Sequence, residues 1–217
     1  MRIVLLGAPG SGKGTQCKQI VTRYGLLHLS SGDILRQERS LGSKLGKKAQ
    51  SYMDSGALVP DEIIIEMMVN AIEKAPDAGF VLDGFPRTVN QAIELDKSLD
   101  RDGLAIDVVL NLVIDDSIVV SRITGRRSCP KCGAVYHIKN LKPKREGLCD
   151  NDDTELVHRP DDTIEVVANR LETYHRQTEP LVGYYKKNGT VFDIEADRSA
   201  DEVKAALFEK LDALVAT

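Results

Sequence analysis

The chain has 217 residues, of which 42% are hydrophobic and 29% are charged, and this composition predicts a globular protein with one core, or one core that carries insertions. The formal net charge is −4 and the pI is near 5.6. This balance argues against a general nucleic-acid-binding protein, which is usually basic, but it leaves open a cleft where arginines bind a small phosphorylated ligand.

The N-terminal stretch MRIVLLGAPG has one arginine and a short apolar run that ends in glycine. The run is too short for the apolar region and cleavage site of a signal peptide, and it is typical of a buried strand. No apolar stretch reaches the length needed to span a membrane. We therefore expect a cytoplasmic protein without a membrane partner.

Four short apolar runs are typical of strands that are buried on both faces, and they lie at residues 2–6, 80–83, 108–113 and 190–194. Longer segments with helical periodicity separate these runs. Strands that alternate with helices indicate an α/β fold, in which helices cover both faces of a parallel sheet.

Two polar stretches interrupt this alternation. Residues 30–59 have a helical pattern that opens with a capping box at Ser30, and residues 125–162 contain cysteines, prolines and many charges. After the second stretch, Asp162 is predicted to cap a helix, with Glu165 three residues later. We expect two insertions on a core made of residues 1–29, 60–124 and 163–217.

The stretch GAPGSGKGTQ follows the first predicted strand, and Gly7, Gly12 and Lys13 match the pattern G-x-x-x-x-G-K. The next residue is Gly14, so Thr15 supplies the hydroxyl one position later than in the general pattern. Such glycines let backbone N–H groups turn toward phosphate oxygens at a helix N-terminus, where Lys13 would reach the transferred phosphate and Thr15 would contact Mg²⁺ or phosphate. A tight turn with an exposed lysine is the alternative, but the flanking strand and helix favour phosphate binding.

The helix predicted after this loop has an apolar stripe formed by Cys17, Ile20, Val21 and Tyr24. Gly25 is suited to end the helix in a left-handed conformation. Cys17 is therefore predicted to be a core thiol rather than a metal ligand.

Asp83 ends the apolar run GFVLD, at the carboxyl end of a predicted strand. A carboxylate there is predicted to hold Mg²⁺ through water, and a simple turn residue before Gly84 is the alternative. Many ATPases carry glutamate where Gly84 stands, and no NKxD motif for guanine is present. Both absences weaken an ATPase or a GTPase function.

Five arginines lie in or near the loops and insertions that follow. A single surface arginine is usually only solvated, but converging arginines stabilise the charge that phosphoryl transfer spreads over many oxygens. The candidates are Arg36, Arg87, Arg126, Arg159 and Arg170.

The motifs GxPGSGKGTQ, DGFPRT, GRR followed by C-x₂-C, RPDD and RLETYHRQTEPLVGYY run through essentially the whole chain. Together they resemble the adenylate kinase family of P-loop nucleoside monophosphate kinases, in the long form with a zinc-bearing lid. The resemblance implies a three-layer fold with a five-stranded parallel sheet, a small helical insertion that covers AMP and a small β lid that closes over ATP. It also implies a monomer that catalyses MgATP + AMP = 2 ADP for adenine nucleotide homeostasis.

The resemblance also implies the roles of individual residues. The ATP-binding residues would be Gly10, Ser11, Gly12, Lys13, Gly14, Thr15, Arg126, Val135, Tyr136 and Arg198, the last through its backbone. The AMP-binding residues would be Ser31, Arg36, Ala57, Leu58, Val59, Gly84, Phe85, Pro86, Arg87, Gln91, Arg159 and Arg170. The catalytic residues would be Lys13, Arg87, Arg126, Arg159 and Arg170.

The second insertion contains Cys129 and Cys132 in a zinc-knuckle turn, followed by Cys149, with Asp152 at the spacing of a fourth ligand. Three thiolates and one carboxylate are acceptable ligands for structural Zn²⁺, which would hold together a lid that lacks its own core. A disulfide plus a free cysteine is the alternative. The other candidates for the fourth ligand are Asp150, Asp153, His137 and His158.

Three other functions stay open. Another nucleoside monophosphate kinase, acting on UMP/CMP or GMP, would share the phosphate loop and the arginines. An ATPase switch would need no acceptor. A zinc-dependent nucleic-acid module would fit the basic stretch KNLKPKRE, but interleaved aromatic residues are nearly absent and the rest of the chain is acidic. We therefore expect ATP, AMP and ADP as ligands and no nucleic acid.

Overall fold

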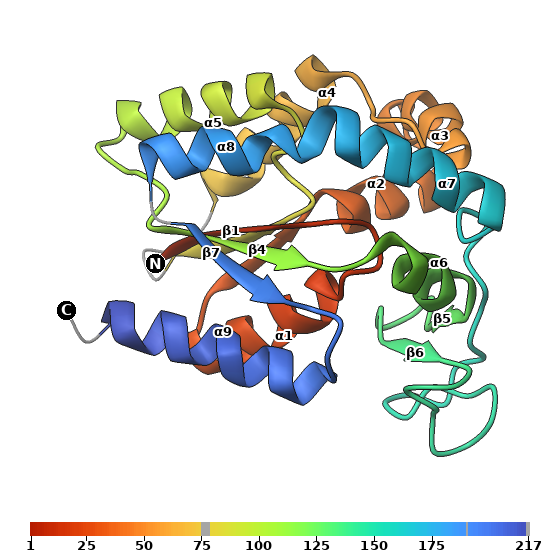
Figure 1. Ribbon diagram of the computed structural model, residues 1–217. Helices are drawn as coiled ribbons and strands as arrows, with labels where there is room; N and C mark the ends of the chain where they lie inside the picture. Colours follow the sequence, from red (N-terminus) through yellow and green to blue (C-terminus); the bar gives the residue numbers. More distant parts are fainter. Residues whose placement is uncertain (75–78, 190, 216–217) are drawn as a thin grey trace.

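The computed structural model describes residues 1–74, 79–189 and 191–215. In this part of the chain, five parallel strands form the central sheet in the order β2-β3-β1-β4-β7 (Figure 1). The strands are β1 (Arg2–Gly7), β2 (Leu27–Ser30), β3 (Phe80–Asp83), β4 (Val108–Val113) and β7 (Val191–Glu195). The predicted α/β fold with a five-stranded parallel sheet is confirmed.

Three of the apolar runs form strands at the predicted places, and the fourth forms β7, which extends to Glu195. Its predicted first residue, Thr190, lies outside the described residues, as do residues 75–78 and 216–217 of the predicted core. The pattern missed β2, because His28 and Ser30 interrupt its apolar run. Tertiary pairing with β3 makes this segment a strand.

Helices cover both faces of the sheet (Figure 1). Ile3 and Leu5 of β1 pack in one buried cluster with residues of α1 and α9, whereas Val4 and Leu6 pack in another with residues of α4, α5 and α8. This alternation buries β1 on both sides, as its continuous apolar run predicts. The helices are α1 (Lys13–Tyr24), α4 (Asp61–Ile72), α5 (Val89–Arg101), α8 (Pro180–Asn188) and α9 (Ala200–Val215).

The predicted apolar stripe of α1 is confirmed. Cys17 and Ile20 are fully buried, and Val21 and Tyr24 pack against the same cluster. Gly25 ends the helix with a φ of 66°.

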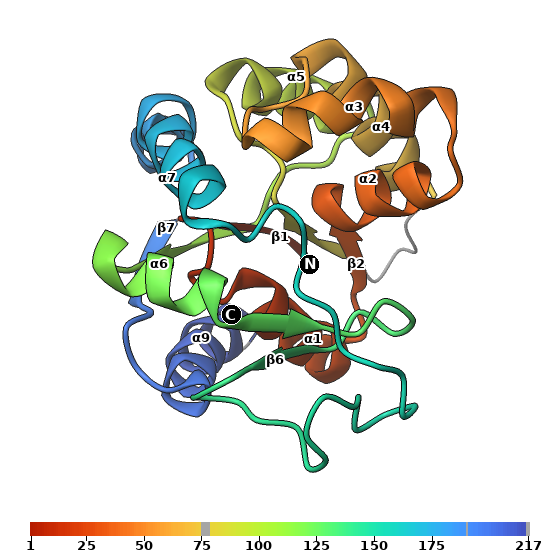
Figure 2. The ribbon, with the colours of Figure 1, turned by 90° about the vertical axis from the view of Figure 1, so that its right-hand side faces the viewer.

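The two polar stretches form structures beside the sheet (Figure 2). The first contains α2 (Ser31–Ser40) and α3 (Lys44–Ser55), which pack against each other. As predicted, Ser30 caps α2, and its hydroxyl accepts a hydrogen bond of 3.2 Å from the Asp33 amide. The second contains a separate antiparallel pair, β5 (Arg126–Ser128) and β6 (Val135–His137).

The predicted helix cap at Asp162 is wrong. The helix that follows, α7 (Ile164–Thr173), is capped by Thr163, whose hydroxyl accepts a hydrogen bond from the Val166 amide. The Asp162 carboxylate is fully buried and pairs with Arg126 instead. The reason is that a partly buried guanidinium needs an anion, whereas a hydroxyl is sufficient at the helix end.

Two more elements complete the description. The helix α6 (Asp116–Thr124) leads into β5, and a π-helical turn, η1 (Tyr174–Thr178), connects α7 to α8. In the described residues, no helix has both the length and the apolar character that membrane crossing requires.

Candidate active site

A cavity of about 610 Å³ lies beside the phosphate loop. A second cavity of about 70 Å³ shares lining residues with it, among them Arg36, Leu58 and Arg87. The predicted site residues that line the larger cavity are Gly10, Ser11, Gly12, Lys13, Gly14, Thr15, Arg36, Leu58, Asp83, Gly84, Pro86, Arg87, Arg126, Val135, Tyr136, Arg159, Arg170 and Arg198.

The smaller cavity adds four more of the predicted residues, namely Ser31, Ala57, Val59 and Gln91. Phe85 lines neither cavity, because its side chain is fully buried in the core cluster beneath this loop. Of the predicted AMP contacts, Phe85 therefore has only its backbone to offer.

The phosphate loop turns at Gly12, which precedes α1 with a φ of 98° and has no side chain to cap the helix. The Thr15 amide already donates to the Gly12 carbonyl, and the N–H groups of α1 before it are left for an anion. The Lys13 amine donates hydrogen bonds of 2.7 and 2.8 Å to the carbonyls of Gly7 and Ala8. The lysine side chain therefore folds back onto the phosphate loop.

The surroundings of Lys13 lower the pKa of its side-chain amine. Burial lowers the pKa of its amine to about 8, against an opposing effect of Asp83, and the charges of Arg87 and Arg170 lower it further. A negatively charged phosphate would reverse this effect.

Asp83 lies at the carboxyl end of β3, beside this loop. A Cβ atom on Gly14 would lie 3.5 Å from Asp83 Oδ2, so the carboxylate faces the first turn of α1. The Asp83 side chain is 14% exposed and lines the larger cavity, where a hydrated cation could reach it.

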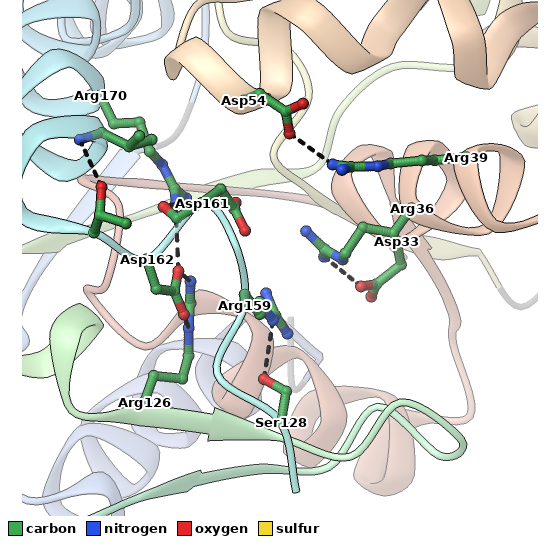
Figure 3. A network of polar contacts seen from close by, with 12 residues as sticks. Asp33, Arg36, Arg39, Asp54, Arg126, Ser128, Arg159, Asp161, Asp162 and Arg170 are labelled. Carbon is green, nitrogen blue, oxygen red and sulfur yellow. Dashed lines mark hydrogen bonds and ion pairs between the residues drawn. The ribbon is translucent and has the colours of Figure 1, made fainter.

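Ion pairs and a hydrogen bond to a hydroxyl hold the arginines around the larger cavity (Figure 3). Arg126 Nε donates to Asp162 Oδ2 at 2.8 Å. Arg170 Nη1 lies 3.3 Å from Asp161 Oδ2 and 3.8 Å from Asp162 Oδ1. Arg159 Nε donates to the Ser128 hydroxyl at 2.9 Å.

The arginines also repel one another. Burial, together with the charges of Arg126 and Arg36, lowers the pKa of Arg159 to about 10. Burial lowers the pKa of Arg170 to about 10 as well, with Arg126 and Arg87 adding to the effect and Asp161 opposing it. The site therefore holds an excess of positive charge, which a polyanionic ligand would relieve.

Arg87 is positioned through the backbone. Its Nε donates at 2.7 Å to the Gly84 carbonyl, which also accepts a hydrogen bond of 2.5 Å from the Ser31 hydroxyl. Thr178 Oγ1, in the π-helical turn, donates to the Arg87 carbonyl at 2.9 Å. Gly84 has a φ of 73°, and a Cβ atom there would lie 2.8 Å from Arg87 Nη2, so only glycine fits without strain.

The Gln91 side chain is buried, and hydrogen bonds fix both the oxygen and the nitrogen of its amide group. Its Oε1 accepts from the Arg87 amide at 2.7 Å, and its Nε2 donates to Asp61 Oδ1 at 2.6 Å. Asp61 and Thr178 are not among the residues predicted from the sequence. Asp61 follows a proline at a helix start, which in the sequence indicates only a favourable first helical turn.

The four predicted metal ligands come together. One ligand atom from each of Cys129, Cys132, Cys149 and Asp152 lies within 4.8 Å of the others. Cys129 Sγ is 3.5 Å from Asp152 Oδ1, and the sulfurs of Cys132 and Cys149 are 3.5 Å apart, so the three cysteines are free rather than disulfide-bonded. Three sulfurs and one carboxylate at this spacing are compatible with a tetrahedral metal site.

The other candidates for the fourth ligand lie outside this cluster. The His137 ring contacts backbone amide and carbonyl groups, and Asp150 accepts from a backbone amide. Asp153 pairs with an arginine, and His158 is exposed. The geometry thus favours Asp152 over the four others.

A family model described as adenylate kinase matches residues 5–190. The chain belongs to the adenylate kinase family. The enzyme is therefore a phosphotransferase of the nucleoside monophosphate kinase class, which interconverts ATP plus AMP with two ADP. This is the predicted activity, and it is favoured over the three alternative functions.

Relatives named adenylate kinase align with nearly the whole enzyme. One from Clostridioides difficile is 48% identical over 204 residues, which cover 94% of each chain. One from Hydrogenobaculum sp. is 47% identical over 215 residues, covering 99% of this chain and 100% of the relative. One from Lachnospira eligens is 44% identical over 212 residues, covering 97% and 100%. The predicted resemblance to the adenylate kinase family is confirmed.

We expect nucleotide binding to depend on pH through the amine of Lys13. In the free enzyme the amine loses its proton as the pH rises through about 8, whereas bound phosphate favours the charged form. ATP binding is therefore expected to take up a proton above pH 8, and its affinity should fall by at most about tenfold per pH unit there. Calorimetry at pH 9, in two buffers with different ionisation enthalpies, measures this uptake.

The matched control is Lys97→Met, which removes an exposed lysine that pairs with Glu94 and lines neither cavity. This variant should keep the proton uptake. An ATP affinity that stays constant from pH 7 to 9.5, without proton uptake, would contradict the prediction.

Proposed function

We propose that the enzyme holds MgATP in the larger cavity and AMP in the smaller cavity that adjoins it, and transfers the phosphoryl group directly, in line, between them. The observation that carries this proposal is the convergence of the phosphate loop and the five candidate arginines on a single cavity of about 610 Å³. Adenine nucleotide homeostasis would be the physiological role.

In this proposal, the phosphate loop from Gly10 to Thr15 binds the phosphates of ATP, and Lys13 follows the transferred group. Arg126, Val135 and Tyr136 contact ATP from the lid, and the backbone of Arg198 meets the adenine. Magnesium, bound through water by Asp83, would neutralise charge on the β- and γ-phosphates.

The smaller cavity would receive AMP. Its apolar side is lined by Ala57, Leu58 and Val59, which would contact the base. The amide of Gln91, which hydrogen bonds hold in place, would form hydrogen bonds with the edge of the adenine. Gly84 to Arg87 and Ser31 would complete this end. The phosphate would meet the remaining arginines of the AMP site, namely Arg36, Arg159 and Arg170.

The reaction needs no strong general base, because the AMP phosphate is already an anion at neutral pH. Lys13 and the four catalytic arginines, Arg87, Arg126, Arg159 and Arg170, would supply positioning and charge stabilisation. We infer that residues 30–59 close over AMP and residues 125–162 close over ATP, on a core of residues 1–29, 60–124 and 163–217. Their closure would exclude water, which competes for the γ-phosphate, and their opening would limit turnover.

We further infer that Cys129, Cys132, Cys149 and Asp152 hold a structural zinc ion in the lid. Four protein ligands leave no open position for chemistry, so the metal would supply folding energy only. We also infer a monomer that works in the cytoplasm without nucleic-acid or membrane partners.

The test is to give the purified enzyme only ADP and Mg²⁺ and to follow the reaction by ³¹P NMR. Equal amounts of ATP and AMP are expected, because one ADP must act as donor and another as acceptor. ADP that stays untouched, while ATP with UMP, CMP or GMP reacts, would contradict the assignment of AMP as acceptor. Release of inorganic phosphate without an acceptor would contradict direct transfer.

A further inference from the structure

A second group of metal-ligating side chains lies beside the phosphate loop, far along the sequence from the cysteines of the lid. One ligand atom from each of Cys17, His28 and Asp83 lies within 4.8 Å of the others. Cys17 belongs to α1, His28 to β2 and Asp83 to β3. We propose that these three residues form a second divalent-metal site, which takes ions of the zinc class.

The register of the sheet places the two strand residues on one face. Ser30 pairs with Asp83 and His28 pairs with Val81, so His28 and Asp83 lie diagonally on neighbouring strands with their side chains on the same side. Val81 packs in the cluster that contains Cys17, so this is the side covered by α1. The thiol therefore faces the imidazole and the carboxylate.

The distances suit a small cation. His28 Nε2 lies 3.6 Å from Asp83 Oδ2. In a tetrahedral zinc site with bonds of about 2.0–2.3 Å, ligand atoms are separated by roughly 3.3–3.7 Å. The imidazole–carboxylate distance already falls in this range, and the Cys17 sulfur lies within 4.8 Å of both ligand atoms.

The His28 ring has a buried nitrogen, Nε2, whose hydrogen-bonding capacity the described residues do not use. It is buried and has no hydrogen-bond partner among the described residues, although its ring lies beside a carboxylate. A buried polar atom without a partner is costly, and a metal ion would give it one. The Lys13 amine does not supply this partner, because it donates to the loop carbonyls of Gly7 and Ala8.

The ligand types of Cys17, His28 and Asp83 determine which metal ion the site prefers. One thiolate and one imidazole favour zinc and similar borderline ions over magnesium, which prefers oxygen ligands. Three protein ligands leave a fourth position, and His28 and Asp83 both line the larger cavity. Water or a phosphate oxygen would fill that position. The sequence predicts Cys17 to be only a core thiol, and the structure places two metal-ligating side chains beside it.

Occupation of this site has a consequence for catalysis, which rests on the proposed role of Asp83. A zinc ion bound to this carboxylate would compete with the hydrated magnesium of ATP. Zinc beyond the amount that saturates the lid should therefore inhibit the enzyme, even with magnesium in excess.

The test counts zinc ions bound to the full-length enzyme, by competition with a chromophoric zinc indicator. The wild-type chain is expected to bind one zinc ion more than Cys17→Ser and one more than His28→Gln, whereas His158→Gln, an exposed histidine of the lid, should match the wild type. Cys132→Ser should lose a different zinc ion, so failure of the lid assignment is seen separately. Thermal melting of each variant checks that it is folded.

Equal zinc binding by the wild-type chain, Cys17→Ser and His28→Gln would overturn the site. If the extra ion binds as expected, zinc inhibition should also be at least about tenfold weaker in both variants. Loss of the extra ion without any change in inhibition would overturn its competition with magnesium.

Discussion

Replacing Arg87 by alanine is expected to lower kcat by about 100- to 1,000-fold, the usual cost of removing one donor that stabilises charge in a transition state. The guanidinium lines both cavities, at the place where the proposed donor and acceptor phosphates would meet. Steady-state kinetics with ADP, and with ATP plus AMP, measure the effect.

The fold should tolerate this change. Arg87 Nε donates to the Gly84 carbonyl, but that carbonyl keeps the hydrogen bond from the Ser31 hydroxyl. The substitution therefore leaves no buried carbonyl without a donor, and it removes a charge whose pKa is lowered by burial. The melting temperature should change little, and wild-type kcat in the variant would contradict the catalytic role.

Arg101→Ala is the matched control for this experiment. Arg101 ends α5, the helix that follows the Arg87 loop, and among the described residues its exposed side chain donates only to the Lys97 carbonyl. It lines neither cavity. Its removal should leave kcat within about twofold of the wild type.

The second large effect is expected in the lid. Removal of the proposed zinc ion by a chelator, or the substitution Asp152→Ala, should lower the melting temperature by roughly 6–12 °C. This follows from a loss of about 3 kcal/mol at 2–4 °C per kcal/mol for a chain of this size, and structural zinc sites can contribute several times more. The described part of the lid offers little to replace the metal, since its buried cluster consists of Cys129, Tyr136 and Cys149.

Calorimetry and limited proteolysis check this prediction, and cleavage should begin within residues 125–162. The control is Asp153→Asn, one position away. Asp153 has a φ of 57°, which asparagine tolerates, and its carboxylate pairs with Arg145 rather than with the cysteines. An unchanged melting curve after chelation, or equal destabilisation by both substitutions, would contradict a structural metal held by Asp152.

The features that the sequence predicted correctly depend on neighbours in the chain. The turn from β1 into α1 requires glycines and a lysine at short, fixed spacing, so the phosphate loop can be recognised from its residues alone. The CxxC turn has the same local character, and Asp152 stands three residues after Cys149. Buried strands such as β1 can also be recognised, because both of their faces are apolar.

The features that the sequence did not predict depend on residues far apart. Asp162 has the pattern of a helix cap, yet it pairs with Arg126, which lies 36 residues earlier. The amide of Gln91 is oriented by Asp61, 30 residues earlier, and the segment of β2 becomes a strand only beside β3. No periodicity or spacing connects such partners.

The sequence by itself therefore determined the parallel α/β architecture, the phosphate loop and the family, since local conformation and the order of motifs carry that information. Only the tertiary structure decided which carboxylate neutralises which arginine, which backbone groups hold Arg87, and that Cys17 meets His28 and Asp83. The physical reason is that electrostatic pairing and metal ligation act over a few ångströms in space, and the sheet brings distant residues to that distance without leaving a local pattern.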